Sequence, residues 1–316
     1  MNYNHFTTEE RACIAVYVEQ GLKITQVAKL LNRDKSAISR ELKRNRNKEG
    51  QYFAVGAQRK YNKRRKRCGR KAILTTKKSL YDAVYCGLEQ YWSPEQIANT
   101  LPNDAKIGVS TIYRSIKNKL FPKEITKKLR RYGKHLKHKK TKGVCYDFSD
   151  VRTFGQRPTT VLDRREKGHW ELDTVVLRQE CGCHLATFVE RTSRLLLIKR
   201  IDNKKAKTMS DVIIEALRPL PQTLKKTLTV DRGLEFTDWK RLECVLNVKV
   251  YFCDPYKPWQ RGSNENTNGL IRQFFPRRTI LPPVTDKLVK QVQDLINNRP
   301  RKCLNWSSPY QIFCCT

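Results

Sequence analysis

Residues Trp170–Leu177 read Trp-Glu-Leu-Asp-Thr-Val-Val-Leu, and this stretch decides the fold class of the C-terminal half. Its length and its β-branched and aromatic residues predict a strand. Because side chains alternate along a strand, Glu171 and Asp173 lie on the same face. Reactive residues gather at strand ends in α/β sheets, so this strand is a candidate for chemistry.

The segments that follow alternate between strand and helix patterns. Two further strands, Leu185–Val189 and Leu195–Ile201, come directly after the first. The later elements are predicted in this order: a helix at Met209–Leu217, a strand at Leu228–Val230, a helix, a strand at Val248–Phe252, and helices from about Asn264 and about Asp286. This order is typical of a mixed α/β domain.

Residues 1–58 predict a domain of short helices. Thr7 and Glu10 have the spacing of a capping box, ahead of a first helix that ends at Gly21. The apolar residues of a second helix share one face: Val27, Leu30 and Leu31. A third helix begins near Lys35, after a turn of three or four residues, and this arrangement matches a helix-turn-helix.

The third helix has a polar face that is strongly basic. That face consists of Lys35, Ser36, Ser39, Arg40, Lys43 and Arg44, while Ala37, Ile38 and Leu42 point inward. An ordinary three-helix bundle with a basic surface is the alternative interpretation. We favour DNA binding, because the basic residues occupy the face that packing leaves free.

Residues 80–121 predict a second helical unit. Ser93 and Gln96 have capping-box spacing, and Pro94 stands in the first turn. A turn at residues 102–108 separates this helix from the next, which gives a weaker helix-turn-helix pattern. Packing and DNA contact are equally good interpretations of this unit.

Charge and composition indicate the class of partner. The 316-residue chain has 65 Lys and Arg against 30 Asp and Glu, a net charge of +35. Nucleic acid is the simplest partner for such an excess. Apolar residues make up 39% and aromatic residues 9%, which excludes global disorder, and the length allows two or three domains.

Two basic tracts interrupt the folded segments. Arg59–Lys71 and Lys127–Lys142 each contain nine Lys or Arg residues. Neither tract has an apolar periodicity that could build a core, so they predict linkers over residues 59–79 and 122–158. A solvated charge run is the alternative, but flanking helical units favour contact with phosphate.

The sequence also predicts an intracellular environment. No apolar run approaches the roughly 18 residues of a membrane span, and no signal-like apolar stretch stands at the N-terminus. The eleven cysteines are odd in number and form no Cys-x-x-Cys motif, which argues against a disulfide framework. Zinc bound by Cys181, Cys183 and His184 is the alternative, but their spacing favours free thiols.

Three separated carboxylates could support chemistry in this basic protein. Asp173 lies on the first strand, Asp231 ends the fourth, and Glu265 opens a helix after a Pro-rich loop. Mg²⁺ prefers oxygen ligands and binds through a few carboxylates and a substrate phosphate. Other carboxylates are equally available on composition alone: Glu171, Glu190, Asp202, Glu235 and Asp254.

Several segments resemble the bacterial insertion sequence thirty family of transposases. They are Ile38–Asn45, Gly168–Val176, Thr229–Phe236, Asp254–Tyr256, Pro258–Gly262, Asn264–Gly269, Asn298–Leu304 and Pro309–Tyr310. The resemblance covers nearly the whole chain. One position departs from the pattern: Leu172 stands where the family commonly has a small residue, usually glycine.

The resemblance implies a ribonuclease-H-like core over residues 159–316, of the type found in retroviral integrases, with Asp173, Asp231 and Glu265 as its catalytic triad. It also implies two Mg²⁺ or Mn²⁺ ions, with Asp173 bound to both. The expected partners are double-stranded DNA, as terminal inverted repeats and target, and further copies of the chain. A bacterial cytoplasmic protein associated with the nucleoid is expected.

Neighbouring residues suggest supporting roles, each with a structural alternative. Arg261 and Arg272 are close enough in sequence to Glu265 to contact phosphate, or they are solvated. Trp170 favours core packing, and Trp259 could pack or stack on a base. His169 is interpreted as structural rather than as a metal neighbour.

Two rival functions remain open at this point. A non-catalytic DNA-binding regulator could keep the helix-turn-helix and use a decayed core only for multimerisation. A nuclease that degrades RNA could use the same core, although the helix-turn-helix argues against it.

Overall fold

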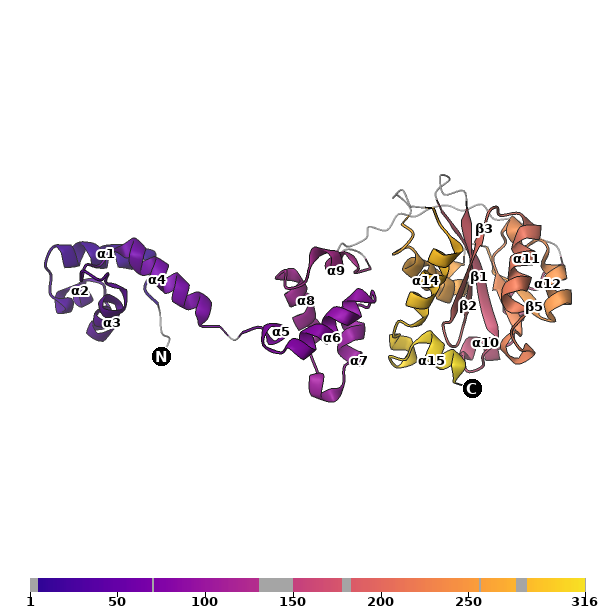
Figure 1. Cartoon of the computed structure of the whole chain (residues 1–316), viewed down its shortest axis with the longest axis horizontal. Coiled ribbons are helices and arrows are strands. Elements are labelled where there is room, and N and C mark those ends of the chain that lie inside the picture. The colour runs from indigo at the N-terminus through magenta and orange to yellow at the C-terminus, as the bar shows by residue number, and fades with distance from the viewer. Residues whose placement is uncertain are drawn as a thin grey trace. The chain divides into compact units, whose positions relative to one another are not determined.

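The computed structural model describes residues 5–69, 71–130, 150–177, 183–255, 257–276 and 283–315. It divides into two compact units, Met1–Thr76 and Lys77–Thr316 (Figure 1). The first is entirely helical in its regular structure, and the second combines helices with a five-stranded sheet.

The described part of the first unit contains five helices, of which the first three are the predicted ones. The five are α1 (Thr8–Glu19), α2 (Ile24–Leu30), α3 (Lys35–Asn45), α4 (Ala54–Arg67) and the short α5 (Ile73–Thr76). The capping box of Thr7 and Glu10 is present, and Gly21 has a positive φ of 80° after α1. Ile14, Ile38 and Ala57, from α1, α3 and α4, are fully buried in the shared core.

The face predicted for α2 is partly wrong. Val27 is fully buried, but Leu30 is 58% exposed. Ala28 is buried in its place, and Leu31 packs against the core from the end of the helix. The buried side of this two-turn helix therefore follows an i, i+1, i+4 spacing, which brings Ala28 rather than Leu30 to the interior.

Helix α3 presents the predicted polar face to solvent. Asp34 caps its N-terminus by accepting a hydrogen bond from the Ser36 backbone N–H at 2.6 Å. Ile38 and Leu42 are buried, and Ala37 is half-buried. All six predicted contact residues are exposed: Lys35, Ser36, Ser39, Arg40, Lys43 and Arg44.

Helix α4 differs from the predicted linker over its basic residues 59–67. Two of these residues bind the end of α3: Lys60 Nζ donates to the carbonyl oxygens of Asn45 and Arg46, at 3.2 and 2.8 Å, and Arg64 Nη2 donates to Asn45 Oδ1 at 2.7 Å. Cations at the C-terminal end of a helix satisfy its unpaired carbonyls and dipole. This docking adds to the burial of Ala57 in the core shared with α1, and the two together support the helix. Of the second basic tract, residues 131–142 lie outside the described residues.

The second unit begins with a helical part that includes the predicted segment 80–121. Its helices are α6 (Lys78–Glu89), α7 (Pro94–Thr100), α8 (Val109–Lys117) and α9 (Lys123–Lys127). Ser93 and Gln96 form the expected capping box at α7. Ile97 and Ile112 are buried, so apolar packing organises this part of the chain.

The sheet has the strand order β3-β2-β1-β4-β5. The strands are β1 (His169–Val176), β2 (His184–Glu190), β3 (Leu196–Ile201), β4 (Thr227–Val230) and β5 (Lys249–Phe252). β1, β2 and β3 pair antiparallel, whereas β1 with β4 and β4 with β5 pair parallel. The prediction of a mixed α/β domain is confirmed, with strand ends within one residue of the expected bounds.

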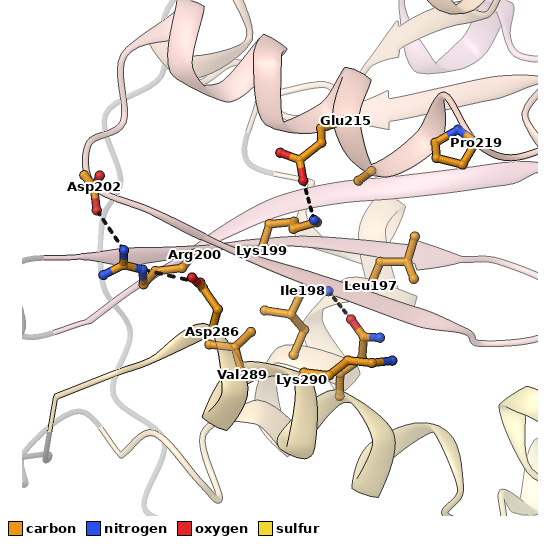
Figure 2. A pocket seen from close by; sticks show the side chains of 12 residues that line it. Leu197, Ile198, Lys199, Arg200, Asp202, Glu215, Pro219, Asp286, Val289 and Lys290 are labelled. Carbon is orange, nitrogen blue, oxygen red and sulfur yellow. Dashed lines mark hydrogen bonds and ion pairs between the residues drawn. The ribbon is translucent and has the colours of Figure 1, made fainter.

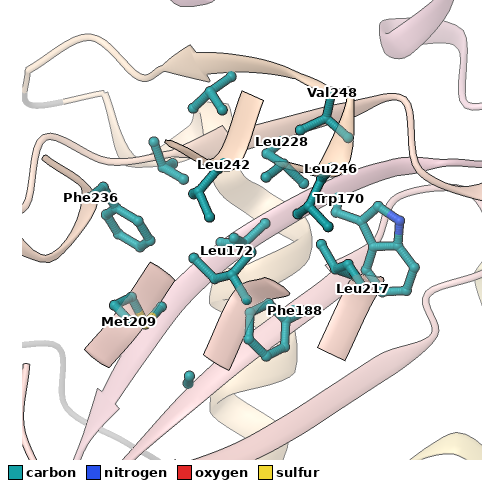
Figure 3. Close-up of a cluster of buried hydrophobic side chains, with 14 of the residues drawn as sticks. Trp170, Leu172, Phe188, Met209, Leu217, Leu228, Phe236, Leu242, Leu246 and Val248 are labelled. Atoms are coloured by element: carbon teal, nitrogen blue, oxygen red, sulfur yellow. The ribbon is translucent and has the colours of Figure 1, made fainter. Parts of the chain in front are cut away.

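Helices cover both faces of this sheet (Figure 1). α11 (Ala206–Leu217) and α12 (Trp239–Leu246) share one apolar cluster with the strands, which Figure 3 shows around Trp170 and Leu172. α13 (Gly262–Ile271) and α14 (Asp286–Asn297) contribute to a second cluster. Leu172, the position that departs from the family pattern, is fully buried in the first cluster.

The edge strand β3 is held by side chains of α14. Asn297 Oδ1 accepts a hydrogen bond from the Leu196 backbone N–H at 2.9 Å, and its Nδ2 donates to the Leu196 carbonyl at 2.8 Å. Gln293 Oε1 accepts from the Ile198 N–H at 2.9 Å. These bonds satisfy backbone groups that an edge strand would otherwise leave open to another chain.

Replacing Asn297 by Ala should destabilise the second unit by about 2–4 kcal/mol. Asn297 is fully buried, and its loss leaves two buried backbone groups of Leu196 without partners. Urea unfolding followed by tryptophan fluorescence measures the effect. Lys287→Ala, at an exposed position of α14, is the control and should change stability by less than about 0.5 kcal/mol. Equal stability of the two variants would contradict this account.

Candidate active site

The parallel pairing of β1 with β4 brings two predicted acidic residues together. Glu171 pairs with Thr229 in this register, so Asp173 and Asp231 follow at equivalent positions on the adjacent strands. Asp173 lies within β1, and Asp231 comes directly after the last residue of β4. Alternation places both side chains on the face opposite the cluster around Leu172.

Arg261 joins the two carboxylates. Its Nη1 lies 3.2 Å from Asp173 Oδ1, and its Nη2 lies 2.9 Å from Asp231 Oδ2. Arg261 immediately precedes α13, which packs against β1 and β2. The two aspartates thus converge on one cationic group.

Backbone and amide donors hold each aspartate in place. Asn268 Nδ2 donates to Asp173 Oδ2 at 2.8 Å, and the Thr174 N–H donates to Asp173 Oδ1 at 2.9 Å. The Gly233 N–H donates to Asp231 Oδ1 at 3.1 Å. Asn268 was not singled out from the sequence, although its position one turn after Glu265 is a signal that could have found it.

Glu265 lies on α13 but does not complete a cluster in this structure. Its side chain is exposed and makes no hydrogen bond or ion pair with the described part of the chain. Among the described residues, no three His, Cys, Asp or Glu side chains come close enough to share a metal ion. Glu265 shares a side of α13 with Asn268, three residues later, which contacts Asp173.

Comparison with known proteins places these residues in a family. An integrase core domain model matches residues 163–258, and a helix-turn-helix domain model matches residues 2–45. Transposase InsI for insertion sequence element IS30A of Escherichia coli is 36% identical over 98% of this chain and 83% of its own length. The chain belongs to the IS30 family of transposases.

Two further relatives agree over the same span. The transposase for insertion sequence element IS4351 of Bacteroides fragilis is 33% identical over 98% of this chain and 95% of its own. The transposase for IS1086 of Cupriavidus metallidurans is 34% identical over 98% of this chain and 94% of its own. Among solved structures, the catalytic core of BIV integrase covers 46% of this chain and 93% of its own, at 18% identity and a TM-score of 0.36, too low to support an argument.

The family membership decides between the rival functions. The match to an integrase core and to transposases over nearly the full chain supports a polynucleotidyl transferase and does not favour a non-catalytic regulator. Within the described residues, no helix is both long and apolar enough to cross a bilayer.

The alternative carboxylates of the transposase have structural partners. Glu171 pairs with Arg191, Asp202 with Arg200, and Asp254 with Lys257. Glu190 accepts hydrogen bonds from the turn after β2. Of these carboxylates, Glu235 is the best alternative candidate for the site. It accepts a hydrogen bond from Thr174 Oγ1, beside Asp173, at 2.9 Å and raises the pKa of Asp231.

The pKa of Asp231 is raised above its ordinary range. Burial is the main cause, and the negative charges of Asp173 and Glu235 add to it, while Arg261 opposes the shift. Burial would lower the pKa of Arg261, but the two aspartates raise it above its ordinary value, so its guanidinium stays charged. The site favours a cation between the carboxylates.

The other predicted neighbours serve the transposase in different ways. Arg272 Nη2 donates to the Val176 carbonyl at 2.9 Å, so both it and Arg261 bind protein atoms here, and their contact with phosphate stays a prediction. Trp170 is fully buried, which confirms core packing, whereas Trp259 is 69% exposed. His169 is buried and lies 2.8 Å from Thr227 Oγ1, which confirms a structural position.

Two other possible sites lie apart from these carboxylates. A groove of about 670 Å³ runs along the edge strand β3 between α11 and α14 (Figure 2). Most of its charged side chains pair with one another, as Lys199 does with Glu215, and none of the three predicted acidic residues lines it. Of the residues considered for zinc, Cys183 is buried and Cys181 lies outside the described residues.

Replacing Arg261 by Gln should destabilise the transposase by about 1–2 kcal/mol at neutral pH, because two neighbouring carboxylates lose their shared cation. The Asp231 side chain is 36% exposed, so solvent screening keeps the loss modest. A carboxyl group with a raised pKa stabilises the fold when protonated and loses that contribution as pH rises. The difference in stability between the Arg261→Gln variant and the unchanged protein should therefore shrink as pH falls and Asp231 takes up a proton.

Thermal unfolding at pH 7 and at acidic pH, with and without Mn²⁺, measures this effect. We expect Mn²⁺ to raise the melting temperature of the Arg261→Gln variant more than that of the unchanged protein. Arg241→Gln removes a guanidinium that pairs with two aspartates on α11 and beside α12, and it serves as the control. A pH-independent loss in both variants would refute an electrostatic role for Arg261.

Proposed function

We propose that this transposase binds the terminal inverted repeats of its insertion sequence and catalyses metal-dependent DNA cleavage and strand transfer. The convergence of Asp173 and Asp231 on a single cationic group carries the proposal. Two carboxylates from adjacent strands, in a chain with a net charge of +35, suit chemistry on a phosphodiester.

The donor set fits a hard divalent cation. Carboxylate oxygens are the ligands that Mg²⁺ and Mn²⁺ prefer, and the two aspartates already hold a positive charge between them. Glu265 is the proposed third ligand, because it lies one turn before Asn268, which contacts Asp173. In the two-ion arrangement, Asp173 would bind both ions, and Asp231 and Glu265 one each. Bound there, the ions would activate the attacking oxygen and stabilise the leaving one.

The protein groups would mainly position and neutralise. Asn268 holds Asp173 and the Gly233 N–H holds Asp231, so neither carboxylate has to be reoriented when DNA arrives. Water would first break the phosphodiester at the element's end and leave a free 3′-hydroxyl. That hydroxyl would then attack a target phosphodiester, with release of the target's 3′ oxygen.

No protein nucleophile is needed for these steps. Cys253 donates its backbone N–H to the carbonyl oxygen of Val230, the residue before Asp231, at 2.9 Å, and burial raises the pKa of its thiol to about 12. A neutral, buried thiol does not attack phosphorus at physiological pH. The proposal therefore includes no covalent protein–DNA intermediate. When DNA binds, Arg261 would exchange its two aspartate partners for phosphate, which would free Asp173 and Asp231 to bind the ions.

Two surfaces of the first unit would contact the DNA. The exposed polar face of α3 is the proposed reader of bases, with Arg40 near its centre. Helix α4 adds a second surface, because Arg59, Lys63 and Lys66 recur at i, i+4 and i+7 and are all exposed. Since Lys60 and Arg64 dock α4 on the end of α3, the two surfaces belong to one rigid body.

A multimer on two element ends is part of the proposal, because each end must meet the other before joining. We also propose that the protein acts in the bacterial cytoplasm, in association with the nucleoid, where its DNA partners are found.

Glu265→Gln should leave binding of terminal-repeat DNA unchanged and reduce strand joining by about 100-fold or more. Loss of a metal ligand should reduce activity at least as much as loss of a residue that hydrogen-bonds to a ligand. Gel-shift and joining assays with Mg²⁺ or Mn²⁺ on a linear terminal repeat measure the two properties. Asn266→Gln, at the adjacent exposed position, is the control. Full joining activity in the Glu265 variant would reject Glu265 as a ligand.

Substitutions on α3 and α4 should have different signatures. Arg40→Ala should cost about 1–3 kcal/mol of binding and relax the sequence preference at one position. Changing Arg59, Lys63 and Lys66 to Gln should leave the sequence preference unchanged. It should reduce the steepness of the slope of log K against log salt by about 0.9 for each phosphate that is no longer neutralised. Binding measured across a salt series on matched and scrambled repeats separates them. An unchanged preference in the Arg40 variant would assign Arg40 to phosphate.

A further inference from the structure

The helix that carries Glu265 has no cap of its own. α13 begins at Gly262, and the side chain of Arg261, its N-cap residue, makes no capping hydrogen bond. The first four backbone N–H groups of any helix lack partners within the helix. One of these groups, the N–H of Asn264, donates instead to Oε2 of Glu171 at 3.0 Å.

Glu171 reaches this helix from the strand that carries Asp173. It precedes Asp173 by two residues, so both side chains leave the same face of β1. Glu171 is fully buried, and its other oxygen forms an ion pair with Arg191, which is 4% exposed. Arg191 is fixed in turn by donating from Nε to the Val161 carbonyl at 3.2 Å.

Stability alone does not account for this arrangement. Taking two charges out of water is costly, and well-packed apolar side chains of similar volume commonly stabilise a fold as well or better. A carboxylate has two oxygens, however, and Glu171 uses one for Arg191 and the other for the Asn264 N–H. An apolar pair could not supply that second bond. The arrangement therefore serves the start of α13.

We propose that Glu171 is a positioning residue that sets where Glu265 stands relative to Asp173. Glu171 binds the backbone of the residue immediately before Glu265, and it shares a strand with Asp173. The strand thus fixes the first carboxylate of the proposed site directly, and through a helix cap it anchors the turn of α13 that carries the third. This inference rests on the proposed function for its consequence in catalysis.

Paired substitutions separate positioning from simple core support. Glu171→Met with Arg191→Met removes both partners of the ion pair, so neither is left buried without the other, and the cap on Asn264 is lost. Glu171→Gln with Arg191→Met also removes the ion pair but keeps an amide oxygen that can accept from the Asn264 N–H. Lys199→Met with Glu215→Met removes a partly exposed ion pair elsewhere and is the matched control.

Hydrogen–deuterium exchange is the first measurement, made on the full-length chain. In the Met–Met variant we expect amide exchange in the first turn of α13 to rise by about tenfold, the loss expected for one hydrogen bond to a charged group. Exchange in α14 should stay unchanged. The Gln–Met variant should restore slow exchange in α13, and the control pair should not alter it.

Strand joining is the second measurement. The Mn²⁺ concentration that gives half-maximal joining should rise by about tenfold in the Met–Met variant and return toward the original value in the Gln–Met variant, while the Kd for terminal-repeat DNA stays unchanged. The proposal would be overturned if the Met–Met and Gln–Met variants showed the same amide exchange in α13 and the same Mn²⁺ requirement. Equal loosening of α13 and α14 would do so as well, because it indicates core support alone.

The two readouts keep this inference distinct from the proposed function. If the unchanged protein fails to join strands with any divalent ion, the proposed function fails, and exchange in α13 still decides whether Glu171 anchors the helix. If the protein joins strands but the Met–Met variant behaves like the original in both assays, only the positioning role is lost.

Discussion

The parallel pairing of β1 with β4 is the constraint on which the site depends. Its register places Asp173 and Asp231 at equivalent positions on neighbouring strands. Two residues 58 positions apart in the chain are thereby brought side by side. Alternation then directs both side chains to the same face. A slip of one residue in either strand would turn one carboxylate into the apolar cluster around Leu172, so the packing of that cluster also fixes the acidic pair.

Two carboxylates held this close need positive charge nearby. Burial raises the pKa of Asp231, and a cation between the aspartates opposes that cost more than the hydrogen bond from the Gly233 N–H does. Arg261 supplies it from the loop before α13, and the same physical demand makes the position suitable for divalent ions. A side chain can satisfy the carboxylates before DNA arrives and can then exchange them for phosphate. In the proposed function, this electrostatic demand would couple the metal site to the DNA substrate.

Local patterns account for what the sequence could predict. Alternation and β-branched residues place each strand within one residue, and side-chain chemistry gives the caps at Thr7 and Ser93. The exposed face of α3 follows from helical spacing. Contacts between distant residues were not predictable: Arg261 joins partners 88 and 30 residues away, and no local period encodes that choice. The helix α4 was not predicted for the same reason, because its support comes from contacts with α1 and with the end of α3.

The alternation of β1 also explains why the third carboxylate differs from the first two. One face of this strand buries Trp170 and Leu172 in a rigid apolar layer, and the other carries Glu171 and Asp173. Asp173 is therefore fixed by the strand itself. Glu265 has no such backing, since it stands exposed on a helix whose first turn depends on a side chain from β1. In the proposed site, this arrangement would keep two ligands stationary and leave the third able to adjust, which suits chemistry in which metal ions and two DNA strands must all enter the same space.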